Sequence, residues 1–206
     1  MTPDLSFETA LRRQGVHRVA GVDEAGRGPL AGPVVAAAVV LRGKVPPKGV
    51  ADSKKLSAAR REAVFERIEA CCHVGVGIAS VEEIDRLNIL RASHLAMCRA
   101  LESLPIPADY ALIDGNMVPQ DLSIPAEPVV KGDARCASIA AASIVAKVSR
   151  DRIMVDLAQQ YPDYGWDRNA AYPTPEHLRA LRDFGVTPHH RRSFAPVHKI
   201  LVEKND

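Results

Sequence analysis

Runs of apolar residues in the first half of the chain predict a sheet. Residues 33–42 are almost entirely apolar, which is typical of a strand that is buried on both faces. Residues 17–23 contain a shorter apolar run that ends at an acidic residue. Residues 73–80 show an alternating pattern, and residues 109–115 form another apolar run that reaches an acidic residue. We expect strands at these four segments and a fifth, short strand at residues 129–130.

Helical periodicity occupies most of the remaining chain. Ser57 and Asn88 are suitable N-caps, and Tyr161-Pro162 would end the longest helix. Mixed strands and helices followed by helices indicate an α/β core over residues 1–160 and a C-terminal helical extension over residues 161–206. The predicted helices lie within 1–16 and over about 58–72, 81–87, 88–103, 136–160 and 175–184, with a last one from 193 or 196. In the longest helix we expect the inward positions to be Ala141, Ile144, Val145, Val148 and Val155.

Composition narrows the class of protein. The chain has 206 residues, of which 47% are hydrophobic and 25% charged, and its net charge is +2. This balance suits one substantial core, and so small a net charge means that any nucleic-acid site depends on local clustering of basic residues. Aromatic residues make up 4% of the chain, which argues against a broad platform for stacking single-stranded bases.

The cysteines and the apolar runs indicate a soluble, cytoplasmic protein. The four cysteines contain no C-x-x-C pair, so a zinc site is not expected. Adjacent Cys71 and Cys72 suit reduced thiols better than a disulfide framework. The first residues lack the layout of a signal peptide, and the longest apolar run falls short of the ~20 residues that span a bilayer. We therefore expect no membrane contact.

Carboxylates lie at three predicted element ends. Asp23 and Glu24 end the first strand, Asp114 ends the fourth, and Asp133 precedes the longest helix. Clustered carboxylate oxygens suit Mg²⁺ and similar hard cations, and two such ions about 4 Å apart can clamp both reacting oxygens of a phosphodiester. Adjacent strand residues normally point to opposite faces, so Asp23 and Glu24 can share a site only if the strand ends and twists there.

Each acid also has a simpler explanation. Asp133 taken alone is better explained as a helix N-cap, and Asp114 before Gly115 as a turn residue. For Asp23 and Glu24 the two explanations are balanced, since buried strand ends disfavour unpaired carboxylates. The three positions together favour a metal site, provided that they meet in space.

A glycine-rich loop, Gly26-Arg-Gly-Pro-Leu-Ala-Gly32, follows the acidic pair. A dinucleotide-binding loop would need a helix directly after it, whereas Pro33 and an apolar run predict a strand. The loop instead suits a close approach of bare backbone to a ligand. Such a backbone can detect the 2′-hydroxyl that distinguishes ribose from deoxyribose.

Other polar side chains are candidate contacts for a nucleic acid, and for each basic residue a solvated surface position is the simpler explanation. Ser143 either lines a site or packs within the long helix. Tyr172 is either structural or an exposed ring that stacks on a sugar or base. The basic candidates for phosphate contact are Lys54, Lys55, Lys131, Arg135, Lys147, Arg150 and the run 189–192.

Taken together, these motifs resemble the ribonuclease HII family, the bacterial type 2 ribonucleases H. The resemblance covers about residues 18–198, and the combination of motifs is far more specific than any one of them. In chain order, the matching segments are Val22–Pro33, Asp52–Ser57, Ile113–Gly115, Val130–Asp133, Ile139–Lys147 with Arg150 and Asp151, Tyr172–His177, and His190–Phe194.

The resemblance implies a ribonuclease H-like mixed β-sheet flanked by helices, with a C-terminal helical extension that contributes to substrate binding. It implies a site that uses Mn²⁺ or Mg²⁺, with two ions during catalysis. The implied metal ligands, which are also the catalytic residues, are Asp23, Glu24, Asp114 and Asp133. For substrate binding it implies a 2′-hydroxyl sensor at Gly26, Arg27 and Gly28 and a stacking tyrosine at Tyr172. To these we add Lys54, Ser143 and Lys147 as candidate substrate contacts.

The chain also departs from the family pattern. Ala170-Ala171 stand where Lys-Gly is usual before the tyrosine, and Trp166 stands where phenylalanine is common. An alanine does not readily adopt a glycine-only backbone conformation, so we expect a different turn before Tyr172. No clamp-binding tail is recognisable after Phe194, so docking to a replication clamp is not expected, and we expect a monomer.

The expected partners are RNA–DNA hybrids and DNA duplexes that contain ribonucleotides. We expect an endonuclease that hydrolyses the RNA strand of hybrids and nicks duplex DNA on the 5′ side of single ribonucleotides, leaving 3′-hydroxyl and 5′-phosphate ends. The alternatives are a junction resolvase on the same fold, which would ignore the 2′-hydroxyl, a non-catalytic nucleic-acid-binding module, and a dinucleotide-dependent enzyme.

Overall fold

A five-stranded mixed sheet forms the centre of the molecule. The computed structural model describes residues 2–43, 45–50 and 56–203. The strand order is β3-β2-β1-β4-β5. Strand β1 pairs antiparallel with β2 and parallel with β4, while β2 and β3 are antiparallel and β4 and β5 are parallel. The strands are β1 (Val19–Ala25), β2 (Val34–Leu41), β3 (Cys72–Ala79), β4 (Tyr110–Asp114) and β5 (Ala126–Val129).

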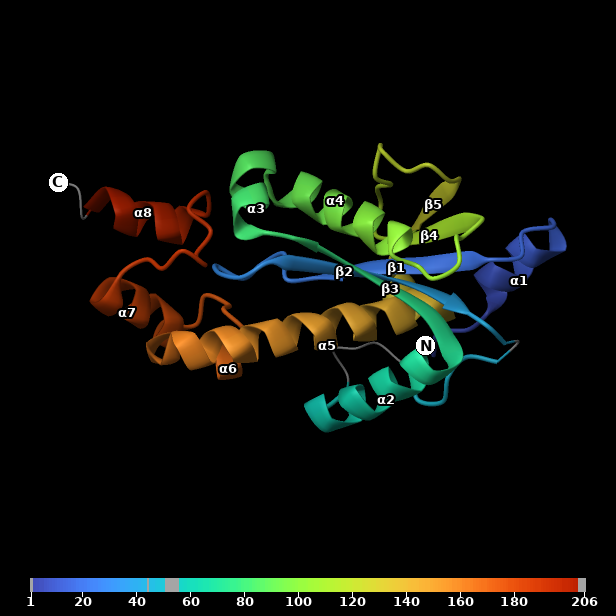
Figure 1. The fold of residues 1–206 in the computed structure, drawn as a ribbon, viewed down its shortest axis with the longest axis horizontal. Helices are drawn as coiled ribbons and strands as arrows, with labels where there is room; N and C mark the ends of the chain where they lie inside the picture. Colours follow the sequence, from blue (N-terminus) through green and yellow to red (C-terminus); the bar gives the residue numbers. More distant parts are fainter. Residues whose placement is uncertain (1, 44, 51–55, 204–206) are drawn as a thin grey trace.

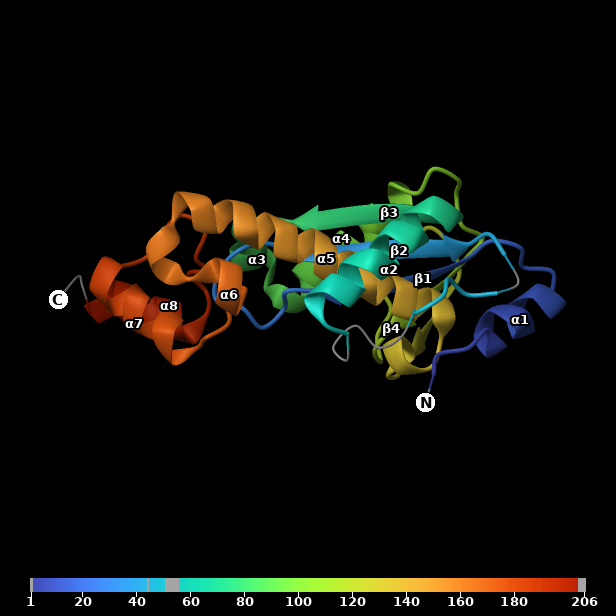
Figure 2. The same cartoon turned by 90° about the horizontal axis from the view of Figure 1, so that it is seen from below.

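Helices cover both faces of this sheet, as Figure 1 shows, with α3 and α4 on one side and α5 and α2 on the other. Seen from below, α2 and α5 lie across the strands (Figure 2). The predicted α/β core is therefore confirmed. The helices are α1 (Ser6–Arg13), α2 (Ala58–Cys71), α3 (Val81–Leu87), α4 (Ile89–Glu102), α5 (Ala137–Gln160), α6 (Trp166–Asn169), α7 (Pro175–Phe184) and α8 (Ala195–Glu203), with short 3₁₀ turns at Gly132–Ala134 and Pro162–Tyr164.

The alternation of side chains along β2 divides the core into two layers. Ala36 and Ala38 face the cluster that contains the buried residues of α4. Ala37 and Val39 face the cluster built from α2 and α5. The small alanine side chains let helices approach both faces of the sheet closely, which explains why this apolar strand is poor in large residues.

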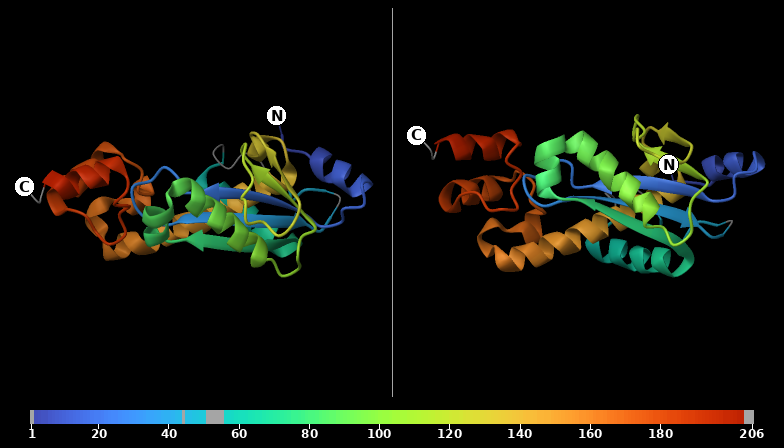
Figure 3. Two further views of the ribbon diagram at one scale, coloured as in Figure 1. Left: turned by 90° about the horizontal axis from the view of Figure 1, so that it is seen from above. Right: turned by 45° about the horizontal axis from the view of Figure 1, so that its top comes forward.

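The two ends of the sheet are closed by different parts of the chain. Helix α1 lies at one end, and α6, α7 and α8 gather at the other, as the views in Figure 3 agree. Trp166, fully buried, packs in a cluster with Met154 of α5 and Ala31 of the loop between β1 and β2. The C-terminal helices therefore pack against the core rather than standing apart from it. None of the described helices is long and apolar enough to cross a membrane.

The start of α5 is capped by a side chain from α1. The buried carboxylate of Glu8 accepts hydrogen bonds from the main-chain N–H of Ser138, at 2.8 Å, and from the Cys136 thiol, at 3.2 Å. The N-cap residue is Cys136, whose own side chain makes no cap bond. Asp133 lies in the preceding 3₁₀ turn, so the simpler explanation of Asp133 as the cap of this helix is wrong.

Three local predictions need correction. Strand β5 spans Ala126–Val129 rather than residues 129–130, because an edge strand tolerates Pro128, which cannot donate to a ladder. Val155 is 43% exposed because it lies on the outer side of α5. None of the predicted helices covers residues 166–169, but Trp166–Asn169 forms the short helix α6.

Gly21 sets the distance between β1 and α5. A Cβ atom at Gly21 would lie 2.2 Å from the main-chain nitrogen of Ile139 and 2.2 Å from the carbonyl carbon of Ser138. Main-chain atoms of a packed helix cannot move aside, so Gly21→Ala is expected to cost about 3 kcal/mol of unfolding free energy. Denaturant unfolding with an unchanged m-value would measure this loss.

The matched control is Gly43→Ala. The nearest atoms to a Cβ at Gly43 are 3.7 Å away, so this variant is expected to stay within about 0.5 kcal/mol of the parent. Equal stabilities for the two alanine variants would show that β1 and α5 are not in close main-chain contact.

Candidate active site

Three of the four predicted metal ligands line one cavity at the ends of β1 and β4. These strands are parallel neighbours in which Val22 pairs with Ile113, so Asp23 and Asp114 occupy the next step of the ladder. Every second side chain of a strand points to the same face of the sheet. Gly21 lies against Ser138 and Ile139 of α5, and Leu112 packs with Ile139. Asp23 and Asp114 are two positions further along these strands, so they point toward α5 as well. The residues that line the cavity are Asp23, Glu24, Ala25, Gly26, Arg27, Gly28, Arg61, Asp114, Ser143, Lys147, Arg150 and Tyr172.

Asp23 is a buried carboxylate among other carboxylates. Burial, reinforced by the charges of Glu24 and Asp114, raises the pKa of Asp23 well above its ordinary value. Hydrogen bonds from Ser143 of α5 and from the main-chain N–H of Glu24, at 2.7 Å, offset only part of this effect. An ionised Asp23 is therefore electrostatically costly unless a positive charge joins it.

Glu24 lines the same cavity, although strand β1 does not end at this residue. Strand β1 continues to Ala25, which pairs with Val35, so it ends two residues after the predicted end at residue 23. Burial raises the pKa of Glu24, although Arg27 acts against this, and the two side chains form an ion pair of 3.0 Å between Glu24 Oε1 and Arg27 Nη1.

Asp114 and Asp133 are brought together through the main chain. Asp114 Oδ1 accepts hydrogen bonds from the N–H groups of Gly132, at 2.7 Å, and Asp133, at 3.4 Å. A Cβ at Gly132 would lie 2.6 Å from Ile139 Cδ1 and 3.1 Å from Asp114 Oδ1, so a larger residue would displace the Ile139 side chain and crowd Asp114. Asp133 is buried and lies beside Asp114, although it is not among the residues that line the cavity.

The donor set suits a hard divalent cation. The carboxyl oxygens of Asp23, Glu24 and Asp114 share one cavity and raise one another's cost of ionisation, which a bound cation would relieve. Across the described residues, no three Asp, Glu, His or Cys side chains already form a metal-binding group. Glu24 is turned toward Arg27, so this ion pair would rearrange on binding, whereas the bond from the Gly132 N–H to Asp114 engages Oδ1. The metal ligands therefore stay predictions.

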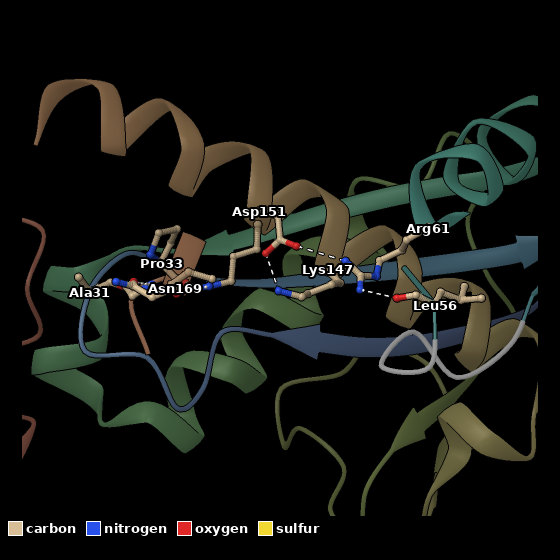
Figure 4. A network of polar contacts seen from close by, with 10 residues as sticks. Ala31, Pro33, Leu56, Arg61, Lys147, Asp151 and Asn169 are labelled. Atoms are coloured by element: carbon tan, nitrogen blue, oxygen red, sulfur yellow. Dashed lines mark hydrogen bonds and ion pairs between the residues drawn. The ribbon is translucent and has the colours of Figure 1, made fainter. Parts of the chain in front are cut away.

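Two cationic side chains on α2 and α5 converge on Asp151. Lys147 donates to Asp151 Oδ1 at 2.5 Å, and Arg61 donates to Asp151 Oδ2 at 3.5 Å and to the carbonyl oxygen of Leu56 at 3.0 Å. Figure 4 shows both cations turned toward this carboxylate. Both also line the cavity. Lys147 was a predicted candidate, whereas Arg61 was missed because nothing in the sequence of α2 distinguishes it from its basic neighbours.

Arg150 and Arg191, two of the candidate phosphate contacts, are interior residues. Each is at most 1% exposed. Arg150 donates to the carbonyl oxygens of Ala31, Pro33 and Ala170. The simpler explanation of a solvated surface position is therefore wrong for this pair, because their guanidinium groups bind the main chain of the loop between β1 and β2.

The predicted strand after the glycine-rich loop is confirmed as β2, so the loop lacks the helix that a dinucleotide site requires. Gly26 has φ of +95°, and a Cβ there would lie 2.1 Å from Arg150 Nε. Glycine is therefore required at position 26 both by the backbone conformation and by the arginine packed against it.

Tyr172 stands beside this loop. Its side chain is 47% exposed, and a Cβ on Gly28 would lie 3.4 Å from Tyr172 Cε1. The tyrosine carbonyl accepts from Nδ1 of buried His177, at 3.0 Å. Trp166 Nε1 donates to His177 Nε2 at 3.1 Å, which requires that the Nδ1 of His177 carries the proton. A fixed histidine tautomer thus holds the main chain of Tyr172.

The unusual alanines before Tyr172 adopt left-handed conformations. Ala170 has φ of +46° and Ala171 has φ of +63°. The surroundings hold both residues there, since Ala170 accepts from Arg150 Nη1 at 3.1 Å and Ala171 accepts from the N–H of Leu30 at 2.8 Å. The sequence predicted a different turn, but these contacts impose the glycine-like conformation on alanine at a cost in stability.

Most of the predicted site residues meet in this one cavity. Asp133 lies next to it through Asp114, and Lys54 falls outside the described residues. Those that line the cavity are Asp23, Glu24, Gly26, Arg27, Gly28, Asp114, Ser143, Lys147 and Tyr172.

Comparison with known proteins places this arrangement in one family. Residues 20–197 match the family profile described as Ribonuclease HII. A Ribonuclease HII from Paracoccus denitrificans is 66% identical over 202 residues, which cover 98% of this chain and 96% of that protein. The ribonuclease H2 of Pyrococcus horikoshii has a similar crystal structure, with a TM-score of 0.78 and 28% identity over 92% of this chain and all of that one.

A more distant solved structure shows the same fold. The structure of Bst-RNase HIII in complex with Mn²⁺ superposes with a TM-score of 0.72 at 22% identity, and the match covers 94% of this chain and 72% of that one. The sheet and flanking helices are thus shared with proteins whose sequences have diverged widely.

The strain at Ala170 can be measured. Ala170→Gly is expected to raise the free energy of unfolding by about 1 kcal/mol, because glycine adopts this conformation at little cost. That gain corresponds to a rise in melting temperature of roughly 2–4 °C for a chain of this size. Thermal unfolding would measure it.

Ala63→Gly is the matched control, because Ala63 is exposed within α2. The same chemical change there is expected to lower stability by up to about 1 kcal/mol. A loss of stability at both positions would contradict the assignment of backbone strain to Ala170.

Proposed function

This chain belongs to the ribonuclease HII family, and we propose that its site nicks duplex DNA on the 5′ side of a single ribonucleotide. As a member of this family it is a ribonuclease H, a hydrolytic endonuclease that acts on RNA–DNA hybrids. The proposal adds the embedded ribonucleotide as a substrate and 3′-hydroxyl and 5′-phosphate ends as the products. The observation that most directly supports this proposal is that the acids and the glycine-rich loop line one cavity.

The four acidic residues are assigned to the hydrolysis of the phosphodiester. We propose that Asp23, Glu24, Asp114 and Asp133 hold two Mn²⁺ or Mg²⁺ ions. Such ions activate water for attack on phosphorus and stabilise the leaving oxygen. The Mn²⁺ complex of Bst-RNase HIII is consistent with this choice. Asp114 accepts hydrogen bonds from the main-chain N–H groups of Gly132 and Asp133, and Ser143 hydrogen-bonds Asp23, so the chain itself orients these carboxylates.

The remaining cavity residues are assigned to the substrate. Lys147 and Arg61 carry positive charge at the cavity wall and suit phosphate oxygens. Lys54 is retained as a candidate phosphate contact. The exposed ring of Tyr172 suits stacking on a sugar. The backbone of Gly26, Arg27 and Gly28 is assigned to the 2′-hydroxyl, which alone separates ribose from deoxyribose.

We further propose that residues 161–206 act as an extension of the catalytic core that contributes to substrate binding. Tyr172 and its buried histidine partner belong to this part of the chain. Four free thiols are consistent with a reducing cytoplasm. A monomer that acts without a replication clamp remains our proposal for its assembly.

The first test is a labelled DNA duplex with one ribonucleotide, incubated with the protein and Mn²⁺. A single nick on the 5′ side of the ribonucleotide is expected, and ligation with end-specific ligases would identify the 3′-hydroxyl and 5′-phosphate. An all-DNA duplex of the same sequence is the control and should stay intact, because it offers no 2′-hydroxyl. Cleavage that ignores the ribonucleotide would instead support a structure-selective nuclease such as a junction resolvase, and binding without cleavage would support a non-catalytic module.

The second test separates catalysis from stability at Asp23. Asp23→Asn is expected to lower the cleavage rate at least about a hundredfold while substrate binding persists. The same variant should unfold at a higher temperature in metal-free buffer at neutral pH, because it removes a buried charge that Glu24 and Asp114 repel.

Asp156→Asn is the control, since Asp156 is an exposed residue of α5 outside the cavity. It should change neither the cleavage rate nor the melting temperature. Full activity of Asp23→Asn would remove Asp23 from the mechanism.

A further inference from the structure

The loop between β1 and β2 is shaped by a residue from the C-terminal end of the chain. Arg191 is fully buried. Its Nη2 donates to the carbonyl oxygens of Gly26, at 2.6 Å, and Pro33, at 3.1 Å. Its Nη1 donates to the carbonyl oxygen of Arg27, at 3.1 Å, and its Nε donates to that of Gly32, at 2.9 Å. One guanidinium group therefore fixes four carbonyls of the same loop.

These bonds decide which way two peptide units face. In a planar trans peptide, the carbonyl of one residue and the N–H of the next point in opposite directions. The carbonyls of Gly26 and Arg27 point to Arg191, so the N–H groups of Arg27 and Gly28 point away from it. Within the part of the chain that is described, neither N–H group donates to a protein acceptor. Both residues line the cavity.

We propose that Arg191 is a positioning residue for ribonucleotide selection, because it turns the N–H groups of Arg27 and Gly28 toward the 2′-oxygen of the bound sugar. Arg191 does not touch the substrate in this arrangement. The inference rests on the proposed function of the loop and adds the residue that sets its geometry.

The neighbouring Arg150 supports the loop from a second side. It donates to Ala31, Pro33 and Ala170 and fills the space beside Gly26, where a Cβ would lie 2.4 Å from its Cδ. Arg150 therefore restrains the start and the end of the loop, whereas the carbonyls of Gly26 and Arg27 depend on Arg191. This division makes Arg191 the residue whose replacement should affect selection of the sugar.

The test uses Arg191→Lys, which keeps the charge but lacks the planar fork that reaches four separated carbonyls. With Mn²⁺ present, kcat and KM are measured on the duplex with one ribonucleotide. The all-DNA duplex is added as a competitive inhibitor, and its Ki is measured in the same assay. We expect kcat/KM to fall at least about tenfold, the effect of losing a pair of oriented hydrogen bonds, while the Ki of the all-DNA duplex stays within about twofold.

The control is Arg179→Lys, at an exposed position of α7 in the same C-terminal region, which should leave all three constants unchanged. A fall in kcat/KM accompanied by an equal weakening of all-DNA binding would overturn the inference, since it would show general damage to the binding surface. An unchanged ratio of kcat/KM to 1/Ki in folded Arg191→Lys would overturn it as well.

Hydrogen exchange on the native protein covers the case in which Arg191→Lys does not fold. The ribonucleotide duplex should slow exchange at the amides of Arg27 and Gly28 more than the all-DNA duplex does, and equal protection by the two duplexes would overturn the inference. If the native protein fails to cleave the ribonucleotide duplex at all, the proposed function fails. If it cleaves normally and only these comparisons fail, the role of Arg191 alone is lost.

Discussion

Two buried guanidinium groups, Arg150 and Arg191, determine the shape of the loop beside the carboxylates. Burial lowers the pKa of Arg150 to about 10 and that of Arg191 to about 9, and in Arg191 the neighbouring Arg150 adds to the effect. Two like charges are thus kept close together in the interior, which is costly unless each is fully hydrogen-bonded. Main-chain carbonyls of residues 26–33 supply most of the acceptors. Any other loop conformation would leave a buried charge without partners.

The same region concentrates charge of both signs around one cavity. Burial makes the negative charges of Asp23 and Glu24 costly. Asp114 adds a third carboxylate, and Arg61 and Lys147 contribute positive charge to the same cavity. A phosphodiester together with divalent cations would complement both sets, because cations would neutralise the acids and the phosphate oxygens would pair with the basic side chains. Folding alone does not explain this arrangement, since three converging carboxylates destabilise the protein that carries them. Function is the better explanation of their position.

Much of this architecture could be predicted from the sequence, and the failures have physical causes. The apolar runs located β1 and β2, and Ser57 and Asn88 cap helices as expected. The sequence does not show which strand lies at the edge of a sheet. The fifth strand was therefore predicted at the apolar pair that follows Pro128, whereas β5 includes Pro128. The burial of Arg150 and Arg191 was missed because arginine normally stays at the surface. Their partners are carbonyl oxygens, which carry no sequence signal, and the same is true of the contacts that hold Ala170 in a left-handed conformation.

The conformation of this loop therefore depends on a distant part of the chain. Gly26 and Arg191 are 165 positions apart, yet the arginine sets the direction of the peptide units that follow Gly26. Leu30 and Gly32 add main-chain bonds to Ala171 and His189 of the same C-terminal region. The strand that carries Asp23 and Glu24 runs directly into this loop, so a shift of the C-terminal helices would displace the loop relative to the acids. In the proposed function, discrimination of the sugar and hydrolysis of its phosphodiester would both depend on this one set of buried contacts between the sheet and the C-terminal helices.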